Sequence, residues 1–260
     1  MAATVRTSVT DGVARLTLCR PAEMNAFDGD TARAISDAVD AFAADDLVRV
    51  LVIGSEGDVF SAGGDFNWVL SWPELDAITR RVGADAMMGA VQSVYDFPKP
   101  SIARVHGAAV GGGVGLMLAC DFAIASSTAR FGLTSVRNGL LAGIAIPVLI
   151  EAVGPRMARQ LLMHGGIFDA ETALRIGLVD QIVAPEALDE TVATLGRELM
   201  LGAPSVQRLI KDLIPEIDGH AHDGDVADLI GEHVAAQCTT DEALEGMRAF
   251  LEKRKPRWVN

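Results

Sequence analysis

Cysteine and basic side chains are both scarce in this chain, and each shortage excludes a class of protein. The three cysteines, Cys19, Cys120 and Cys238, lie far apart and form no C-x-x-C pair. This usage argues against a disulfide framework or a structural zinc site and predicts a reducing, cytoplasmic setting. The 22 basic and 35 acidic residues give a net charge of −13. Binding to nucleic acids or anionic membranes depends on clustered Lys and Arg, so we predict neither partner.

Long apolar runs are missing as well. The longest, residues 107–120 and 139–150, are too short to span a membrane and contain several glycines. Residues 1–20 alternate charged and apolar side chains, without the apolar core of about 7–15 residues that a signal peptide has. The sequence therefore predicts neither a membrane segment nor an export signal.

The hydrophobic pattern predicts an α/β fold. Residues 13–18 alternate apolar and polar side chains like a half-buried strand, and residues 48–54 form the continuous apolar run of a fully buried one. Asp30 is predicted to cap a helix, and Pro73 to open a long helix whose apolar face includes Ile78 and Val82. Further strands are predicted at 101–105, 122–125 and 178–183.

Beyond Pro185 the predicted strands end and the chain becomes helical. The helices are predicted near residues 186–201, 204–213, 224–236 and 241–254. The chain therefore combines an α/β part of about 185 residues with a helical tail.

Two glycine-rich segments stand out, residues 60–65 (FSAGGD) and 106–115 (HGAAVGGGVG). Each follows a predicted strand and leads into a helix, which leaves backbone N–H groups unpaired at the start of that helix. If the loops converge, two such groups could stabilise a developing oxyanion. Alternatively, the glycines only allow tight packing between helix and strand. Neither segment is a phosphate-binding P-loop, because no G-K-[ST] follows.

An ordered set of motifs resembles the crotonase (enoyl-CoA hydratase/isomerase) superfamily over essentially the whole chain. It consists of residues 20–27 (RPAEMNAF), both glycine-rich segments, Cys120-Asp121, Phe131-Gly132, and residues 152–154, 170–180 and 245–256. The resemblance implies an α/β fold, a spiral of ββα units over residues 1–200, and a helical oligomerisation region over residues 201–260. It also implies a homotrimer or a dimer of trimers.

The resemblance implies that acyl-CoA thioesters are the substrates, with coenzyme A as part of the substrate and no permanently bound cofactor. The thioester oxygen would bind the backbone N–H groups of Ala62 and Gly112, which match the family's oxyanion hole. Asp65 would stabilise its loop rather than transfer protons. The positions that match the CoA-binding residues of the family are Met24, Ala26, Ala62, Gly64, Asp65, Phe66, Phe250 and Lys253.

The carboxylates of the family are absent from this sequence. Hydratases of the family use two glutamates, whose positions are Gly115 and Ser135 here, and a third family carboxylate position is Gly143. Glycine cannot transfer a proton, and the Ser135 hydroxyl is too weak an acid to act as a base unaided. Standard hydration is therefore disfavoured. Three readings stay open: a hydratase or isomerase with a slow rate, a decarboxylase or hydrolase using the same oxyanion hole, and a non-catalytic acyl-CoA-binding subunit.

The remaining candidates for acid–base or metal chemistry have simpler interpretations. Glu74, Asp76, Asp85 and Glu151 are predicted to lie on solvated helix faces. For His106 we predict a structural hydrogen bond. The histidines of residues 220–225 (HAHDGD) lack a third ligand at a typical spacing, so a solvated loop is predicted and no metal site. The basic cluster of residues 253–257 (KRKPR) makes Lys253 a candidate contact for the phosphates of CoA.

Overall fold

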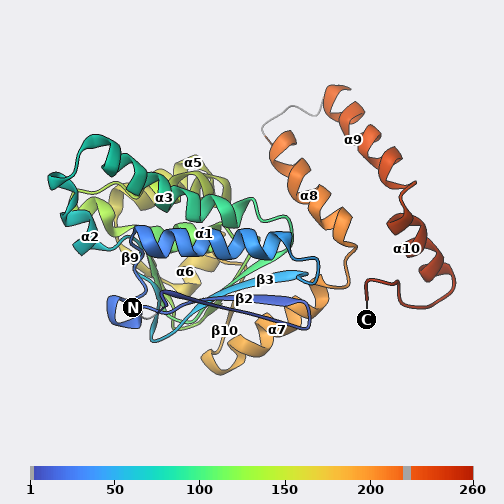
Figure 1. Cartoon of the computed structure of the whole chain (residues 1–260), viewed down its shortest axis with the longest axis horizontal. Coiled ribbons are helices and arrows are strands. Elements are labelled where there is room, and N and C mark those ends of the chain that lie inside the picture. Colours follow the sequence, from blue (N-terminus) through green and yellow to red (C-terminus); the bar gives the residue numbers. More distant parts are fainter. Residues whose placement is uncertain (1–2, 219–223, 260) are drawn as a thin grey trace. The chain divides into compact units, whose positions relative to one another are not determined.

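The computed structural model describes residues 3–218 and 224–259. The chain forms two compact units, residues 1–195 and residues 196–260. The first unit carries the strands and the second is helical over its described residues (Figure 1). None of the helices in the described residues is long and apolar enough to cross a membrane.

The larger sheet of the first unit has six strands in the order β1-β2-β3-β5-β7-β10. The strands β1 and β2 form an antiparallel hairpin, and every other pairing in this sheet is parallel. Parallel central strands are buried on both faces, which explains why β3 is a continuous apolar run. The strands are β1 (Val5–Thr10), β2 (Val13–Leu18), β3 (Val50–Ser55), β5 (Ser101–Val105), β7 (Phe122–Ser126) and β10 (Gln181–Val183).

A second sheet of four short strands, in the order β4-β6-β8-β9, gives the fold its spiral. Each of β3, β5 and β7 is followed by one strand of this second sheet and then by helix, so three ββα turns succeed one another. Three of its strands run parallel and β9 is antiparallel to β8. The strands are β4 (Val59–Ser61), β6 (Ala108–Val110), β8 (Arg130–Gly132) and β9 (Ile167–Asp169).

The helices of the first unit cover these sheets and bury an apolar core between them. Figure 1 shows α1 lying side by side with α3 over the larger sheet. Four phenylalanines, Phe27, Phe60, Phe97 and Phe131, are fully buried in this core. The helices are α1 (Gly29–Ala44), α2 (Phe66–Leu70), α3 (Ala77–Tyr95), α4 (Gly112–Leu118), α5 (Ile146–His164) and α6 (Ala170–Arg175).

Two helix starts differ from the prediction. Asp28, not Asp30, caps α1, because the Asp28 side chain accepts the Thr31 N–H at 2.8 Å. Likewise α3 begins after Asp76, which caps it, while Pro73 opens only a separate 3₁₀ turn. The predicted apolar face of this helix is also wrong in its first half, since Ile78 is 78% exposed.

The second unit contains three helices in its described residues, preceded by α7 (Leu188–Leu199), which spans the boundary between the units. These helices confirm the predicted helical tail. Each of these helices exposes apolar side chains: Ile210, Ile214, Ile230, Val234, Met247, Phe250 and Leu251. The helices are α8 (Pro204–Ile217), α9 (Gly224–Gln237) and α10 (Asp241–Leu251).

Candidate functional site

The first glycine-rich loop connects β4 to α2 and is pinned to the segment before α1. The Ala62 N–H donates to the Met24 carbonyl at 2.9 Å, the Phe27 N–H to the Gly63 carbonyl at 2.8 Å, and the Asp65 N–H to the Phe27 carbonyl at 3.0 Å. No acceptor for the Gly64 N–H occurs among the described residues. The available amide on this loop is therefore that of Gly64, whereas the predicted donor, Ala62, is already paired within the protein.

The second glycine-rich loop connects β6 to α4. The Gly111 N–H donates to the Gly132 carbonyl of β8 at 2.8 Å, and Gly112 is the first residue of α4. A first-turn N–H has no partner inside its own helix, and none for Gly112 occurs elsewhere in the part of the chain that the structure describes. The N–H of Gly112 therefore remains available.

The two loops touch through their backbones. A Cβ built on Gly63 would lie 2.5 Å from the Gly112 nitrogen and 2.8 Å from the Val110 oxygen. Only a glycine allows this approach, and its φ of +84° is also one that other residues rarely adopt. The amides of Gly64 and Gly112 consequently belong to two loops in direct contact.

The surroundings of these amides are largely apolar. The Met87 sulfur lies 3.7 Å from the Cβ position of Gly64, and Phe27 and Ile144 lie against Gly112. The Ser135 hydroxyl oxygen lies 3.5 Å from the Cβ position of Gly111. An apolar environment strengthens any hydrogen bond that a ligand accepts from the amides.

Asn25 fixes the segment that carries the carbonyl of Met24. Its side chain is 1% exposed, and its amide nitrogen donates to the carbonyls of Glu56 at 2.8 Å and Val59 at 2.7 Å. Its amide oxygen accepts the Arg20 N–H at 2.9 Å. Met24 and Asn25 both have left-handed backbone angles, with φ of 51° and 53°. The sequence alone assigns no role to Asn25. Its place in the family motif of residues 20–27 is the signal that could have identified it.

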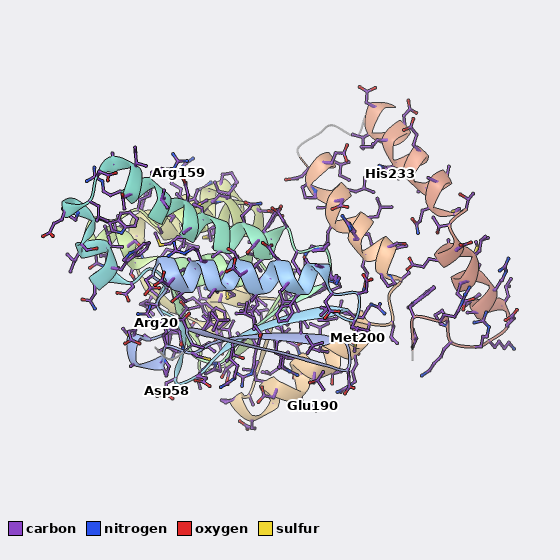
Figure 2. The ribbon with its side chains drawn as sticks, in the orientation of Figure 1. Arg20, Asp58, Arg159, Glu190, Met200 and His233 are labelled. Carbon is purple, nitrogen blue, oxygen red and sulfur yellow. The ribbon has the colours of Figure 1, made fainter. Side chains whose placement is uncertain are left out.

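Arg20 and Asp65 form the second support of this site. An Asp65 oxygen accepts from the Arg20 guanidinium at 2.9 Å, and its other oxygen accepts the N–H groups of Asn67 and Trp68 at the start of α2. Arg20, which Figure 2 labels, also donates to the Ala26 carbonyl at 2.7 Å. The Asp65 carboxylate is thus occupied by backbone and arginine contacts, in keeping with a loop-stabilising role.

The comparisons with known proteins agree with the fold. A model of the enoyl-CoA hydratase/isomerase family matches residues 8–260. The chain belongs to this family. It is 39% identical over 252 residues to a crotonyl-CoA hydratase of Syntrophomonas wolfei subsp. wolfei, with 95% of each chain covered. It is 31% identical over 254 residues to the trans-2-decenoyl-acyl-carrier-protein isomerase of Streptococcus mutans serotype c, with 97% of this chain and 96% of the relative covered.

The solved structures confirm the predicted crotonase fold. An enoyl-CoA hydratase from Shewanella pealeana matches with a TM-score of 0.94 at 30% identity, covering 98% of this chain and 96% of the other. The chain is therefore an acyl-CoA-related member of the enoyl-CoA hydratase/isomerase family.

The first carboxylate position of this enoyl-CoA hydratase/isomerase family member leaves little room for a side chain. A Cβ on Gly115 would lie 3.1 Å from the Cα of Ala145 and 3.3 Å from the Ile144 carbonyl oxygen. Both residues belong to the short 3₁₀ helix η4 (Gly143–Ala145), which packs on α4. Gly143, the third family position, lies in the same turn. The backbone of η4 would thus have to give by a few tenths of an ångström to admit a side chain at Gly115.

The other candidate carboxylates for acid–base chemistry have partners or lie in solvent. Asp76 accepts from the Thr79 N–H and hydroxyl, and these hydrogen bonds lower the pKa of its carboxyl. Asp85 forms an ion pair with Arg81 at 2.6 Å. Glu74 and Glu151 are exposed. These contacts match the predicted solvated helix faces.

His106 has the structural hydrogen bonds that we predicted. Its Nε2 lies 2.7 Å from the Gly57 carbonyl and its Nδ1 lies 3.1 Å from the Arg104 guanidinium. Because guanidinium is only a donor, the neutral ring accepts at Nδ1 and donates from Nε2. Arg104 is also paired with Asp189 at the start of α7.

Replacement of this ring by His106→Ala should lower the free energy of unfolding by about 1–2 kcal/mol, since it removes two hydrogen bonds beside the glycine-rich loop. Urea unfolding followed by circular dichroism measures the change. His164→Ala serves as the control, because His164 is exposed and its loss should cost under about 0.5 kcal/mol. Equal effects of the two substitutions would contradict the structural role of His106.

Phe250 and Lys253 lie at the end of α10 in the second unit. Phe250 is 83% exposed, and Lys253 is exposed with a left-handed φ of 53°. Four non-glycine residues in the described chain have positive φ, and two of them, Met24 and Lys253, are predicted CoA-binding residues.

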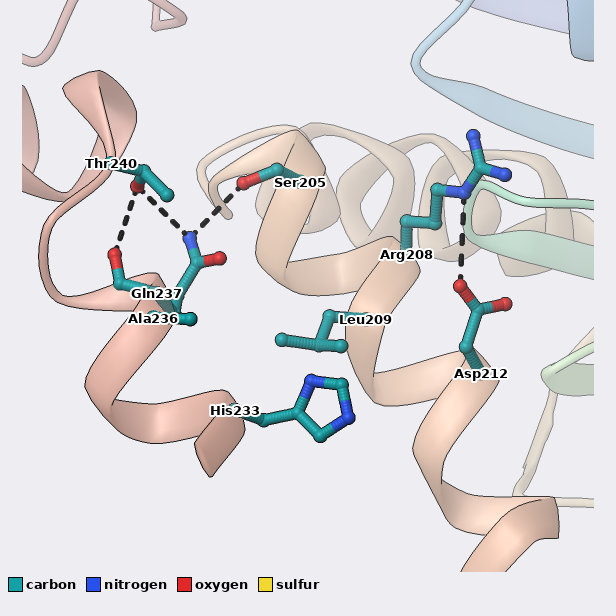
Figure 3. Close-up of a pocket in the computed structure, with 8 residues that line it drawn as sticks. All are labelled: Ser205, Arg208, Leu209, Asp212, His233, Ala236, Gln237 and Thr240. Carbon is teal, nitrogen blue, oxygen red and sulfur yellow. Dashed lines mark hydrogen bonds and ion pairs between the residues drawn. The ribbon is translucent and has the colours of Figure 1, made fainter. Parts of the chain in front are cut away.

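A hollow of about 310 Å³ lies between α8 and α9 (Figure 3). Arg208 is paired with Asp212 at 3.7 Å, and the Gln237 amide donates to Ser205 and Thr240. None of the predicted site residues lines this hollow, whose residues are Ser205, Arg208, Leu209, Asp212, His233, Ala236, Gln237 and Thr240. We therefore assign the candidate site to the glycine-rich loops instead.

The described residues contain no group of three or more His, Cys, Asp or Glu side chains that could hold a metal ion. The predicted solvated loop at residues 220–225 lies mostly outside the described residues, because residues 219–223 are not among them.

Proposed function

We propose that this protein binds an acyl-CoA thioester and stabilises its enolate with the N–H groups of Gly64 and Gly112. The observation that supports the proposal is the contact between two loops, each of which carries an amide without an acceptor among the described residues. This pair replaces the predicted pair of Ala62 and Gly112, because the Ala62 amide is bound to Met24. Two fixed donors stabilise charge where it develops, and loss of one costs roughly 3–4 kcal/mol in other enzymes.

Coenzyme A is proposed to lie along the segment of residues 24–26 and the start of α2. Met24 and Phe66 are exposed there, while Ala26 and Asp65 are held by Arg20. Phe250 and Lys253 are proposed to contact the nucleotide end. The exposed apolar side chains of α8, α9 and α10 support an oligomer, which the family resemblance suggests is a homotrimer or a dimer of trimers. Three free cysteines fit a reducing cytoplasm.

The absence of carboxylates at Gly115 and Ser135, with little room beside Gly115, favours a reaction that needs no glutamate pair. One such reaction is decarboxylation of a thioester that carries a β-carboxylate. The bond between the α-carbon and the carboxylate breaks, CO₂ leaves, and the electron pair forms the enolate whose oxygen accepts from Gly64 and Gly112. Water then protonates the α-carbon. The substrate supplies the driving force, so the site needs only the two donors.

An assay of thioesters tests these alternatives. We expect crotonyl-CoA to be hydrated below roughly 0.1 s⁻¹, because an acid–base pair contributes about 10²–10⁴-fold and the median enzyme turnover is about 10 s⁻¹. Purified protein is incubated with crotonyl-CoA and with malonyl-type and β-keto thioesters, and absorbance and free thiol are recorded. Hydration near 10 s⁻¹ would contradict the argument from the missing glutamates. Tight binding of every thioester without turnover would indicate a non-catalytic binding subunit.

A further inference from the structure

The end of α10 has an unusual backbone for a lysine. The Arg254 N–H donates to the Ala249 carbonyl at 3.0 Å and the Lys253 N–H to the Phe250 carbonyl at 3.2 Å, which closes the helix around Lys253. In this type of helix end, the left-handed residue is usually glycine, because other side chains are strained there. Lysine at this left-handed position has a conformational cost, which points to a functional role for the Lys253 side chain.

A buried carboxylate fixes the chain on the far side of Lys253. Glu245 is 5% exposed, and its two oxygens accept from the Arg254 guanidinium at 2.6 and 3.1 Å. The same carboxylate accepts the Arg257 N–H at 3.0 Å and pairs with the Arg257 guanidinium at 3.3 Å. We call Glu245, Arg254 and Arg257 the clamp. It connects the middle of α10 to both sides of residues 255–256.

The clamp divides the basic cluster of residues 253–257 into two kinds of cation. Both arginines are paired with carboxylates: Arg254 binds Glu245 in a planar, two-pronged geometry and also pairs with Glu252, and Arg257 pairs with Glu245. Lys253 and Lys255 have no ion-pair partner in residues 3–218 and 224–259. The ammonium groups are therefore the cations left for a phosphate ligand.

We propose that Glu245 is a positioning residue for coenzyme A: through Arg254 and Arg257 it holds Lys253 in its left-handed conformation, where the ammonium binds phosphates at the nucleotide end of the substrate. The proposal rests on the proposed function, namely that the protein binds acyl-CoA.

The Glu245 carboxylate of the clamp stays ionised at neutral pH. Hydrogen bonds from Arg254 lower the pKa of Glu245 to about 2. Because this pKa is lowered, the stabilisation that the Glu245 carboxylate gives to the folded state is complete above the ordinary pKa near 4.5. It is lost as the pH falls through about 2. Substitution, rather than acid, is therefore the way to release Lys253.

Binding of two matched ligands by the full-length protein tests the proposal. Isothermal titration calorimetry compares one acyl-CoA with the same acyl group on pantetheine, which lacks the nucleotide phosphates. We expect Glu245→Gln and Lys253→Ala each to weaken acyl-CoA binding about ten- to hundredfold, as loss of a charge-assisted contact does, and to leave acyl-pantetheine binding unchanged. Asp212→Asn, which breaks an exposed ion pair on α8, should alter neither ligand.

A glycine at the strained position separates binding from stability. Lys253→Gly should keep or raise the melting temperature, because glycine accepts a positive φ, while it weakens acyl-CoA binding as much as Lys253→Ala does.

Each other outcome has a defined meaning. Wild-type acyl-CoA affinity in Glu245→Gln, or equal loss for both ligands, would overturn the role of the clamp. If Glu245→Gln does not fold, Arg257→Ala, which leaves the Arg254 pair intact, is judged by the same two criteria. If Lys253→Ala weakens binding and the clamp variants do not, the clamp fails and the proposed function stands. A wild-type protein that binds neither thioester overturns both.

Discussion

Gly63→Ala is expected to lower the free energy of unfolding by about 2–5 kcal/mol and to abolish acyl-CoA binding. The new methyl group would lie 2.5 Å from the Gly112 nitrogen and 2.8 Å from the Val110 oxygen. Both are backbone atoms of the facing loop, so no side-chain rotation relieves the overlap. The cost combines overpacking, about 1–3 kcal/mol, with the left-handed backbone of a non-glycine residue, about 1–2 kcal/mol.

Gly154→Ala is the matched control for Gly63→Ala. Gly154 has a φ of +73° inside the kinked helix α5, but nothing lies within 4 Å of its Cβ position. Its substitution should cost only the backbone term of about 1–2 kcal/mol and leave thioester binding intact. Urea unfolding and titration calorimetry on both variants measure the difference. An equal loss of unfolding free energy in the two variants would show that the close contact between the glycine-rich loops adds nothing to the effect of Gly63→Ala.

Gly115→Glu is expected to lower the free energy of unfolding by about 3 kcal/mol or more without creating a hydratase. The glutamate would replace a buried glycine whose Cβ position lies 3.1 Å from the Ala145 Cα. Overpacking against backbone costs about 1–3 kcal/mol, and a buried carboxylate without a partner adds to that. The turn η4 would have to move before a second glutamate could act with it.

Ser135→Glu, alone and combined with Gly115→Glu, completes this experiment. Ser135 is half-buried in the 3₁₀ helix Thr134–Asn138, where the longer side chain can turn toward solvent, so the single substitution should cost under about 1 kcal/mol. Crotonyl-CoA hydration should stay at the wild-type level in all three variants. A hydratase rate in the double variant, with unchanged stability, would show that η4 yields readily and that only the carboxylates were missing.

The sequence predicted the strands that have a clear hydrophobic pattern and missed the short ones. The strand Ser101–Val105 was predicted at its observed bounds, because a short run with three apolar residues leads through His106 into a glycine turn. The four strands of the second sheet have three residues each, too few to display a period of two. Ile78 shows the opposite failure: helical spacing placed it on the apolar face, but that half of the helix has no core beneath it.

The sequence predicts which two loops form the candidate site, but it does not predict which backbone amide of the first loop is available. Motif matching selected residues 60–65 and 106–115, and it selected the donor Gly112, whose N–H is available. It could not distinguish Ala62 from Gly64, because both are amides of one loop and only the carbonyl of Met24 decides which is occupied. The tight contact of the Gly115 position with η4 could not be predicted either, since η4 comes from a segment some 30 residues away.

The second sheet has a consequence for how the chemistry of this fold can change. Its parallel strands β4, β6 and β8 end next to one another, and each leads into one of the loops around the site. Neighbouring strands lie about 4.8 Å apart whatever their side chains are. The separation of the two amide donors is thus set by backbone pairing alone. Substitutions at positions 115 and 135 would therefore leave the spacing of the two amides unchanged, so the proposed contacts with a thioester oxygen would persist while the reaction differs.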